Sequence, residues 1–242
     1  LSAYVDRSGI PWIGTRGGLE RLDRLTGTFA HISRGSYNPK NSPEGMVQCF
    51  VEDRSGNLWI GTETNGLDRY DRKTGFFTHF RHDAINPRSL SDNRVYALCE
   101  DRTGDIWVGT YGGGLNRFDP TSGTFTRFLH SDSTPGTLGG RGVFSLLEDH
   151  EGFLWVGTFG GGLDRFHRES GTLTHYKHDE ANPKGLSDDV VACLLEDRSG
   201  TLWVGTAGGL NRLDRATDTF KQYHVKDGLP NDVVFGILED ER

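Results

Sequence analysis

The sequence lacks most of the features that mark a membrane protein, a disulfide scaffold or a helical domain. Its 242 residues include three cysteines and one methionine. No apolar run approaches the roughly 18 residues that a transmembrane helix needs, and no segment keeps the 3.6-residue apolar period of an amphipathic helix. The net charge of −7 disfavours nucleic acid and an anionic membrane surface as partners. We therefore expect no helix, no nucleic-acid contact and no membrane contact in this segment.

What the sequence has instead is a repeat of about 48 residues, present five times. Each copy carries a Trp-Ile/Val-Gly-Thr phrase, followed by a Gly-Leu phrase. The tryptophans that mark the copies are Trp12, Trp59, Trp107, Trp155 and Trp203. Glycine is about twice as frequent as usual, and the glycines recur at the same turn positions. This glycine usage indicates turn chemistry and not disorder.

Each copy reads as four short strands separated by turns. In residues 94–128 the strand-like runs are RVYALCED, DIWVGT, LNRFD and TFTRF. We predict that Gly104 takes the left-handed conformation of a bulged hairpin and that Asp218 does the same where other copies have glycine. Four-stranded units of this length predict an all-β fold, a β-propeller of five four-stranded blades.

The repeat also sets the expected domain organisation. We predict a single β-propeller domain over 1–242, and residues 231–242 carry an extra first strand. The predicted blades are approximately 1–42, 43–90, 91–138, 139–186 and 187–230. The sequence starts inside a repeat, without a signal peptide or initiator methionine, which indicates an excerpt of a longer protein and a fragment of a larger ring. Such a fragment would either associate through its open blade edges, which we favour, or close into a five-blade ring with residues 232–240 beside the Trp12 strand.

Residues that recur in every copy are predicted to serve the fold. The tryptophan is expected to pack between adjacent sheets. The aspartate that ends the first strand is expected to cap its turn, and the arginine of the Gly-Leu phrase to pair with a carboxylate. Cys49, Cys99 and Cys193 all fall in first strands, which favours small buried side chains over a disulfide.

The histidines and the remaining polar residues predict no catalysis. His79 and His175 hold matching places in separate blades, whereas metal ligands must converge on one point. No Ser-His-Asp arrangement, nucleophile elbow or phosphate loop is present. We therefore predict no metal, no cofactor, no catalytic residues and no enzyme in this region.

Candidate ligand-binding residues lie where the blade connectors meet the loops between second and third strands, since these emerge at the same end of a blade. The first position of that loop varies while its frame repeats, so we expect specificity there. Tyr111 and Phe159 are exposed aromatics suited to stacking on a sugar face; the alternative is drift on a solvated rim. The candidates are Arg16, Glu63, Asn65, Tyr111 and Phe159 from the loops, with Asn93, Arg94, Arg141 and Asp189 from the starts of first strands.

The phrases EDRSGNLWIGTETNGLDRYD and EDRTGDIWVGTYGGGLNRFD resemble the two-component regulator propeller repeat, as do the connectors NPRSLSDNRV and NPKGLSDDVV. The resemblance covers essentially the whole chain. It implies a periplasmic or extracellular sensor region of a bacterial, often hybrid, histidine kinase. It further implies a seven-bladed ring, often one of two in tandem, followed by an immunoglobulin-like domain, a membrane helix and a kinase.

Three functional classes follow from these observations. A ligand-sensing or ligand-binding module for signal transduction, with a small-molecule or glycan ligand such as a carbohydrate, is favoured. A protein–protein interaction scaffold is the alternative. A propeller lyase or hydrolase ranks last, because no convergent acid and base can be assembled on one face.

Overall fold

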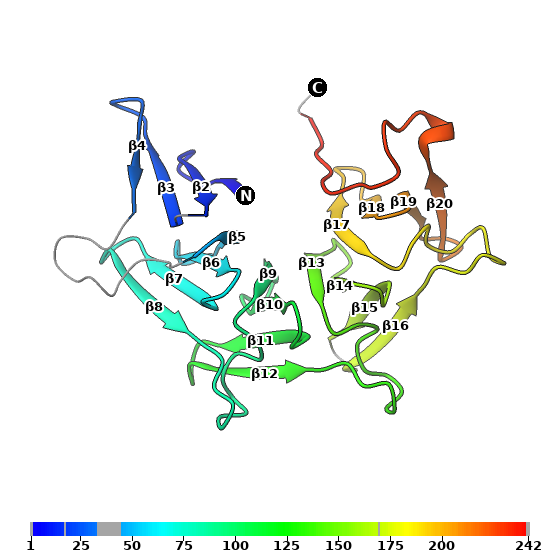
Figure 1. Cartoon of the computed structure of the whole chain (residues 1–242), viewed down its shortest axis with the longest axis horizontal. Helices are drawn as coiled ribbons and strands as arrows, with labels where there is room; N and C mark the ends of the chain where they lie inside the picture. The colour runs from blue at the N-terminus through cyan, green and yellow to red at the C-terminus, as the bar shows by residue number, and fades with distance from the viewer. Residues whose placement is uncertain (1, 17, 33–44, 169, 241–242) are drawn as a thin grey trace. The chain divides into compact units, whose positions relative to one another are not determined.

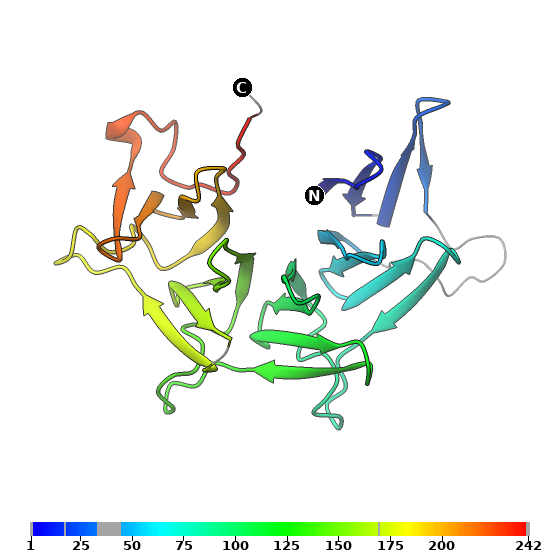
Figure 2. The ribbon, with the colours of Figure 1, turned by 180° about the vertical axis from the view of Figure 1, so that it is seen from behind.

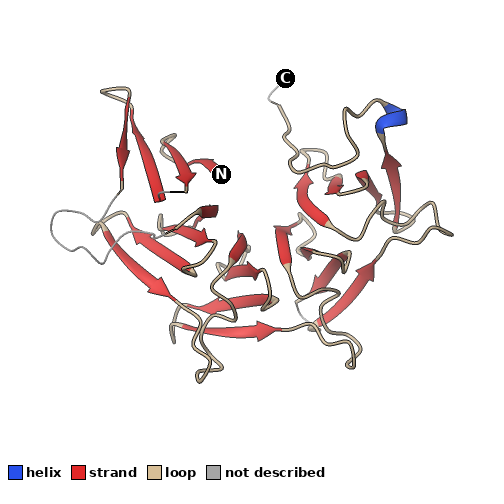
Figure 3. Cartoon of the chain, viewed as in Figure 1, coloured by secondary structure: helices blue, strands red, loops and turns tan. Residues whose placement is uncertain are grey.

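The computed structural model describes residues 2–16, 18–32, 45–168 and 170–240. It consists of five four-stranded antiparallel sheets, in which consecutive strands are neighbours (Figure 1). The chain divides into two compact units, Leu1–Arg127 and Phe128–Arg242. Strands dominate the described residues, and the single helical element is a 3-10 turn, η1 (Val225–Asp227), that follows the last strand (Figure 3). The five sheets confirm the all-β fold with four strands per repeat.

The first unit holds three sheets. They comprise β1 (Ser2–Val5), β2 (Pro11–Thr15), β3 (Gly18–Asp23) and β4 (Thr28–His31); β5 (Val47–Glu52), β6 (Leu58–Thr62), β7 (Leu67–Asp71) and β8 (Phe76–Phe80); and β9 (Val95–Glu100), β10 (Ile106–Thr110), β11 (Leu115–Asp119) and β12 (Thr124–Phe128), whose last residue falls in the second unit. Figure 2 shows the same sheets from behind.

The second unit holds two sheets of the same pattern. They comprise β13 (Val143–Glu148), β14 (Leu154–Thr158), β15 (Leu163–His167) and β16 (Thr172–Tyr176); and β17 (Val191–Glu196), β18 (Leu202–Thr206), β19 (Gly209–Asp214) and β20 (Thr219–Tyr223). Among the described residues no helix is long and apolar enough to cross a membrane.

Each tryptophan is fixed by the aspartate that lies six residues before it. In all five blades the indole Nε1 donates to an aspartate Oδ2 at 2.7–2.8 Å. The second carboxylate oxygen accepts backbone amides of the turn, as at Asp101, where Thr103 and Asp105 donate. The capping role of the aspartate is confirmed, and its bond to the indole is an addition that the constant spacing of six residues could have suggested.

Four of the five tryptophan side chains are at most 2% exposed, whereas Trp203 is only partly buried. Trp59 is stacked at 5.6 Å on Phe80 and meets the edge of Phe118 at 5.0 Å, so it joins the second and third sheets. The expectation of full burial is therefore wrong for Trp203. Its nearest ring partner is Tyr223 of its own blade, at 5.9 Å.

Adjacent blades within a unit come close because a glycine lies in the tryptophan strand, two residues after the tryptophan. A Cβ on Gly61 would lie 2.4 Å from the Cys49 sulfur and 2.6 Å from the Val95 side chain of the next blade. In the second unit a Cβ on Gly157 would lie 2.6 Å from Val191 in the same way. The glycine thus makes room for the first-strand valine of the next sheet.

The cysteines lie in first strands as predicted, and they are free thiols. The thiol of Cys193 approaches the Val234 carbonyl at 3.5 Å. Burial raises the pKa of Cys49 to about 12 and that of Cys193 to about 11, which keeps both thiols protonated and unreactive.

The arginine of the Gly-Leu phrase contradicts the expectation of a carboxylate partner in most blades. The register places it directly across from the tryptophan, as in the pair Trp59 and Arg69. The guanidinium therefore lies over the indole, 5.6–6.0 Å from the ring centroid, in a cation–π contact. This holds for Arg21, Arg69, Arg117 and Arg165. Arg117 and Arg165 alone add a carboxylate within 4 Å among the described residues.

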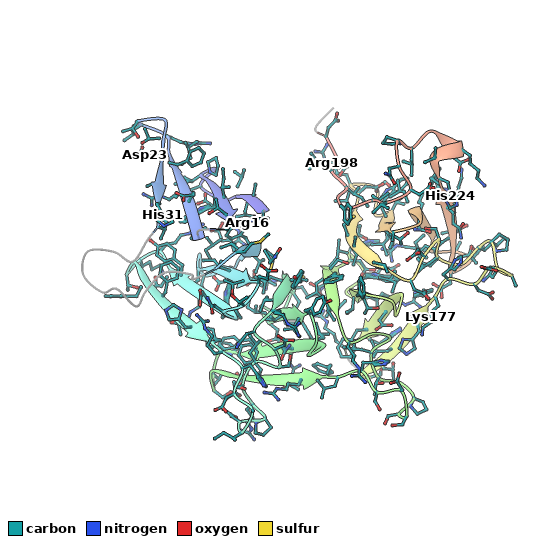
Figure 4. All side chains as sticks on the ribbon, in the orientation of Figure 1. Arg16, Asp23, His31, Lys177, Arg198 and His224 are labelled. Atoms are coloured by element: carbon teal, nitrogen blue, oxygen red, sulfur yellow. The ribbon has the colours of Figure 1, made fainter. Side chains whose placement is uncertain are left out.

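Residues 231–240 do not form the predicted first strand, although they occupy its place. The Val234 amide donates to the Thr206 carbonyl, and the Arg198 amide, labelled in Figure 4, donates to Glu239. In earlier blades the equivalent amide of Arg54 donates to Glu100. Residues 33–44 and 241–242 of the predicted blade bounds lie outside the described residues, and self-association stays a prediction.

Candidate ligand-binding rim

The loops between second and third strands and the blade connectors do meet at one end of the blades. In the first unit the Gly66 amide donates to the Asn93 carbonyl at 2.7 Å. In the second unit the Gly162 amide donates to the Asp189 carbonyl at 2.9 Å. These bonds confirm the predicted common face within each unit. We call this end of a blade the rim.

The first unit's rim carries a charged and aromatic stack on blade three. The Arg94 guanidinium lies 4.6 Å from the centroid of the Tyr111 ring. Asp92 holds it with two hydrogen bonds, Nε to Oδ1 at 3.1 Å and an NH2 group to Oδ2 at 2.7 Å. Partial burial opposes the effect, but the hydrogen bonds from Arg94 hold the pKa of Asp92 below its ordinary value. The pair is therefore charged at neutral pH.

Tyr96 extends this stack and was missed from the sequence. Its ring lies 5.7 Å from that of Tyr111. Burial, and then the negative charge of Glu63, raises the pKa of Tyr96. The predicted residues Glu63 and Tyr111 therefore both act on Tyr96. The signal was available, because alternate residues of a strand point to the same side. The resulting group of Glu63, Tyr96, Arg94, Tyr111 and Asp92 is hereafter the first-unit rim.

Two predicted candidates hold the connectors in place. The Asn93 side chain accepts the His82 amide at 2.7 Å. Asp189 accepts the His178 amide at 2.7 Å in the second unit. Their side-chain oxygens are used by the backbone, so the structure gives both residues a structural task.

The rim of the second unit also carries an aromatic pair. Phe159 is 54% exposed and meets the Phe144 ring edge-on at 5.3 Å, the same pairing as Tyr111 with Tyr96. Arg141 is exposed, 3.7 Å from the Asp132 carboxylate. Phe144, like Tyr96, was not predicted.

The remaining candidates lie on the first two blades. Arg16, labelled in Figure 4, is exposed at the end of β2, and its neighbour Gly17 lies outside the described residues. The Asn65 amide donates to the Thr62 hydroxyl at 2.9 Å, which closes the loop.

Histidines and acids are paired locally in the described part of the chain. His79 Nδ1 lies 2.7 Å from Asp68, and His175 Nδ1 lies 2.6 Å from Asp164. Burial raises the pKa of Asp164 above its ordinary value, although the Gly139 amide and His175 oppose the shift. Among the residues described, no three His, Cys, Asp or Glu side chains gather in an arrangement for a metal.

Four segments match the family model of the two component regulator propeller: 41–64, 89–112, 137–160 and 185–208. Each segment runs from a connector through the tryptophan strand to the rim loop. These four segments carry the repeat of the two-component regulator propeller family. The predicted resemblance is therefore confirmed.

The chain is also similar to solved structures. The extracellular domain of a hybrid two component system from B. thetaiotaomicron is 25% identical, with a TM-score of 0.77, over 91% of this chain and 29% of that one. The chain thus spans less than a third of that domain. No curated protein matches the sequence.

Two more distant structures show the fold alone. PorZ, a surface component of the type-IX secretion system of Porphyromonas gingivalis, is 19% identical with a TM-score of 0.70, over 97% of this chain and 35% of that one. Virginiamycin B lyase from Staphylococcus aureus is 18% identical with a TM-score of 0.64, over 91% of this chain and 68% of that one.

Proposed function

We propose that this chain is a ligand-binding module from the extracytoplasmic sensor part of a two-component signalling protein, and that the first-unit rim binds a carbohydrate. The observation that carries the proposal is the Arg94 guanidinium fixed between the Tyr111 ring and the Asp92 carboxylate. The family repeat and the similarity to an extracellular domain support the signalling context and an extracellular or periplasmic location.

The chemistry of the rim suits a neutral sugar. Tyr111 is 41% exposed and offers an aromatic face, and the hydroxyl groups of Tyr111 and Tyr96 add hydrogen-bonding capacity. Because Arg94 and Asp92 compensate each other, they offer a donor and an acceptor in fixed positions without a net charge. Glu63 adds an acceptor and disfavours an anionic ligand.

The test is glycan binding by the Tyr111→Ala variant. We expect at least one member of a panel of neutral oligosaccharides to bind the chain in calorimetry. The substitution should weaken that binding tenfold or more, since about 1.4 kcal/mol corresponds to a factor of ten. Phe76→Ala is the matched control, because Phe76 is a 63% exposed aromatic at the start of β8, away from the rim loops. Equal binding by the two variants would remove the rim from the proposal.

A protein-binding scaffold is the alternative, because exposed aromatic residues beside an arginine are also favoured at protein interfaces. Absence of binding to the whole panel, with loss of a protein partner in Tyr111→Ala, would favour it. The similarity to a lyase is too distant to carry an activity. We propose no enzymatic function.

A further inference from the structure

Two grooves occupy the same place in two blades, one in each unit. In each, the connector that precedes the blade crosses its outermost strand. The Phe125 amide of β12 donates to the Arg88 carbonyl at 2.8 Å, and the Phe220 amide of β20 donates to the Lys184 carbonyl at 2.8 Å. The groove beside β12 measures about 670 Å³ and that beside β20 about 540 Å³.

The groove beside β20 is strongly basic. It is lined by four cationic side chains: Lys184, Arg212, Lys221 and Lys226. Its only carboxylate is Asp214, whose Oδ1 already accepts the Ala216 amide. His224, labelled in Figure 4, follows β20 and also lines the groove. We call this the basic groove.

The cations of the basic groove are not neutralised by the fold. In the part of the chain that the structure describes, none of the four lies within 4 Å of a carboxylate. Lys221 Nζ lies 4.8 Å from the Tyr223 ring centroid, a cation–π contact that adds no opposite charge. In a chain of net charge −7, such a cluster is a local exception. It acts over short range, because charges are screened beyond about 8 Å at physiological salt.

The groove beside β12 is an internal comparison with fewer cations and more carboxylates: it is lined by Arg88, Arg117 and Arg127 together with Asp105 and Asp119. Arg117 lies 3.9 Å from Asp105. The Arg127 guanidinium donates to the carbonyls of Ser89 and Asn86, so it holds the connector. The residue equivalent to Lys221 is Thr126. The same scaffold therefore presents three cations and two carboxylates in the first unit's groove, and four cations and one carboxylate in the basic groove.

We propose that the basic groove is a binding site for an anionic oligosaccharide, one that carries sulfate or carboxylate groups. Ammonium groups spaced along an open groove match separate anionic groups on an extended ligand, and the hydroxyls of Thr217 and Thr219 can meet its remaining oxygens. For an acidic peptide to bind by adding a strand to the sheet, the edge of β20 would have to be free. That edge of β20 is already taken at Phe220 and, through its side chain, at Gln222.

The test uses a sulfated dextran hexasaccharide as the probe, with the unsulfated hexasaccharide and hexaglutamate as competitors, in calorimetry at low salt. The variant is Lys184→Gln/Lys221→Thr, which places the β12-side threonine at position 221; both lysines are exposed, so folding is unaffected. The matched control is Arg88→Gln, the position equivalent to Lys184 in the first unit. We expect the double variant to bind the probe at least tenfold more weakly and with a smaller salt dependence, and Arg88→Gln to change it less than twofold.

Several results would overturn the proposal. They are absence of probe binding at low salt, an undiminished affinity of the double variant, an equal loss in Arg88→Gln, or tighter binding of hexaglutamate than of the probe. Tyr111→Ala should leave probe binding unchanged. The basic groove and the first-unit rim are thereby tested separately, and either can fail without the other.

Discussion

The two ends of a blade follow different rules. At one end, the turn between the first and second strands repeats an aspartate and a tryptophan joined at 2.7–2.8 Å in every copy. At the other, the loop between the second and third strands keeps its frame, but its first residue changes from Glu63 to Tyr111 to Phe159 to Ala207. Repetition therefore marks the residues that build the blade. A position that varies within this otherwise repeated loop is one whose side chain the fold does not constrain.

The largest effect should come from removing a buried tryptophan. Trp59→Ala should lower the free energy of unfolding by about 3–5 kcal/mol, since it removes a large side chain packed on Phe80 and Phe118. Trp203→Ala should cost less, because Trp203 is only partly buried. Urea denaturation measures both. Equal losses of unfolding free energy in the two variants would mean that the burial of a tryptophan does not determine the cost of removing it.

A smaller effect should follow from changing the aspartate that holds the indole. Arg215 bonds to Asp149 at 2.9 Å, and Asp149 is fully buried. Asp149→Asn should cost about 2 kcal/mol, because it removes a charge-assisted hydrogen bond and leaves the guanidinium less satisfied. The position of Arg215 in blade five is held by Pro120 in blade three, so no equivalent arginine lies beside Asp53. Asp53→Asn is therefore the control. A cost for Asp53→Asn as large as that for Asp149→Asn would assign the effect to the indole bond alone.

The same aspartates should make stability depend on acid. Burial by itself raises the pKa of Asp101 and Asp149, but hydrogen bonds outweigh it and lower the pKa of both. Hydrogen bonds from Ser199 and Trp203 lower the pKa of Asp197 to about 2. A lowered pKa contributes stability above the unfolded value near 3.9, and that contribution is lost as pH falls toward the folded value. The urea midpoint should therefore be level from about pH 8 to 5 and fall between about pH 4 and 2. Asp197→Asn should make this fall shallower, and an unchanged fall would contradict the assignment.

The sequence predicted what repetition can encode. Five tryptophans at constant spacing were enough for the number of sheets, and turn chemistry was enough for Gly104 and Asp218, which both have positive φ. Contacts made across the repeat were harder to foresee. The Arg69 guanidinium over Trp59 depends on strand register. Tyr96 depends on which side of a strand faces the rim, and the free charges of the basic groove depend on which cations find partners.

The smallest effect on stability should come from the rim. Tyr111→Ala should change the free energy of unfolding by no more than about 0.5 kcal/mol, the usual range for surface substitutions away from a buried feature. The loop keeps its shape through backbone and Thr110 bonds, since the Thr110 hydroxyl donates to the Gly114 carbonyl and accepts the Gly113 amide. Thr110→Ala is therefore the contrasting variant: it removes both bonds at a buried position and should cost about 1–3 kcal/mol. If Tyr111→Ala proved as costly as Thr110→Ala, the aromatic ring would belong to the framework, and the distinction between repeated and open positions would not hold at the rim.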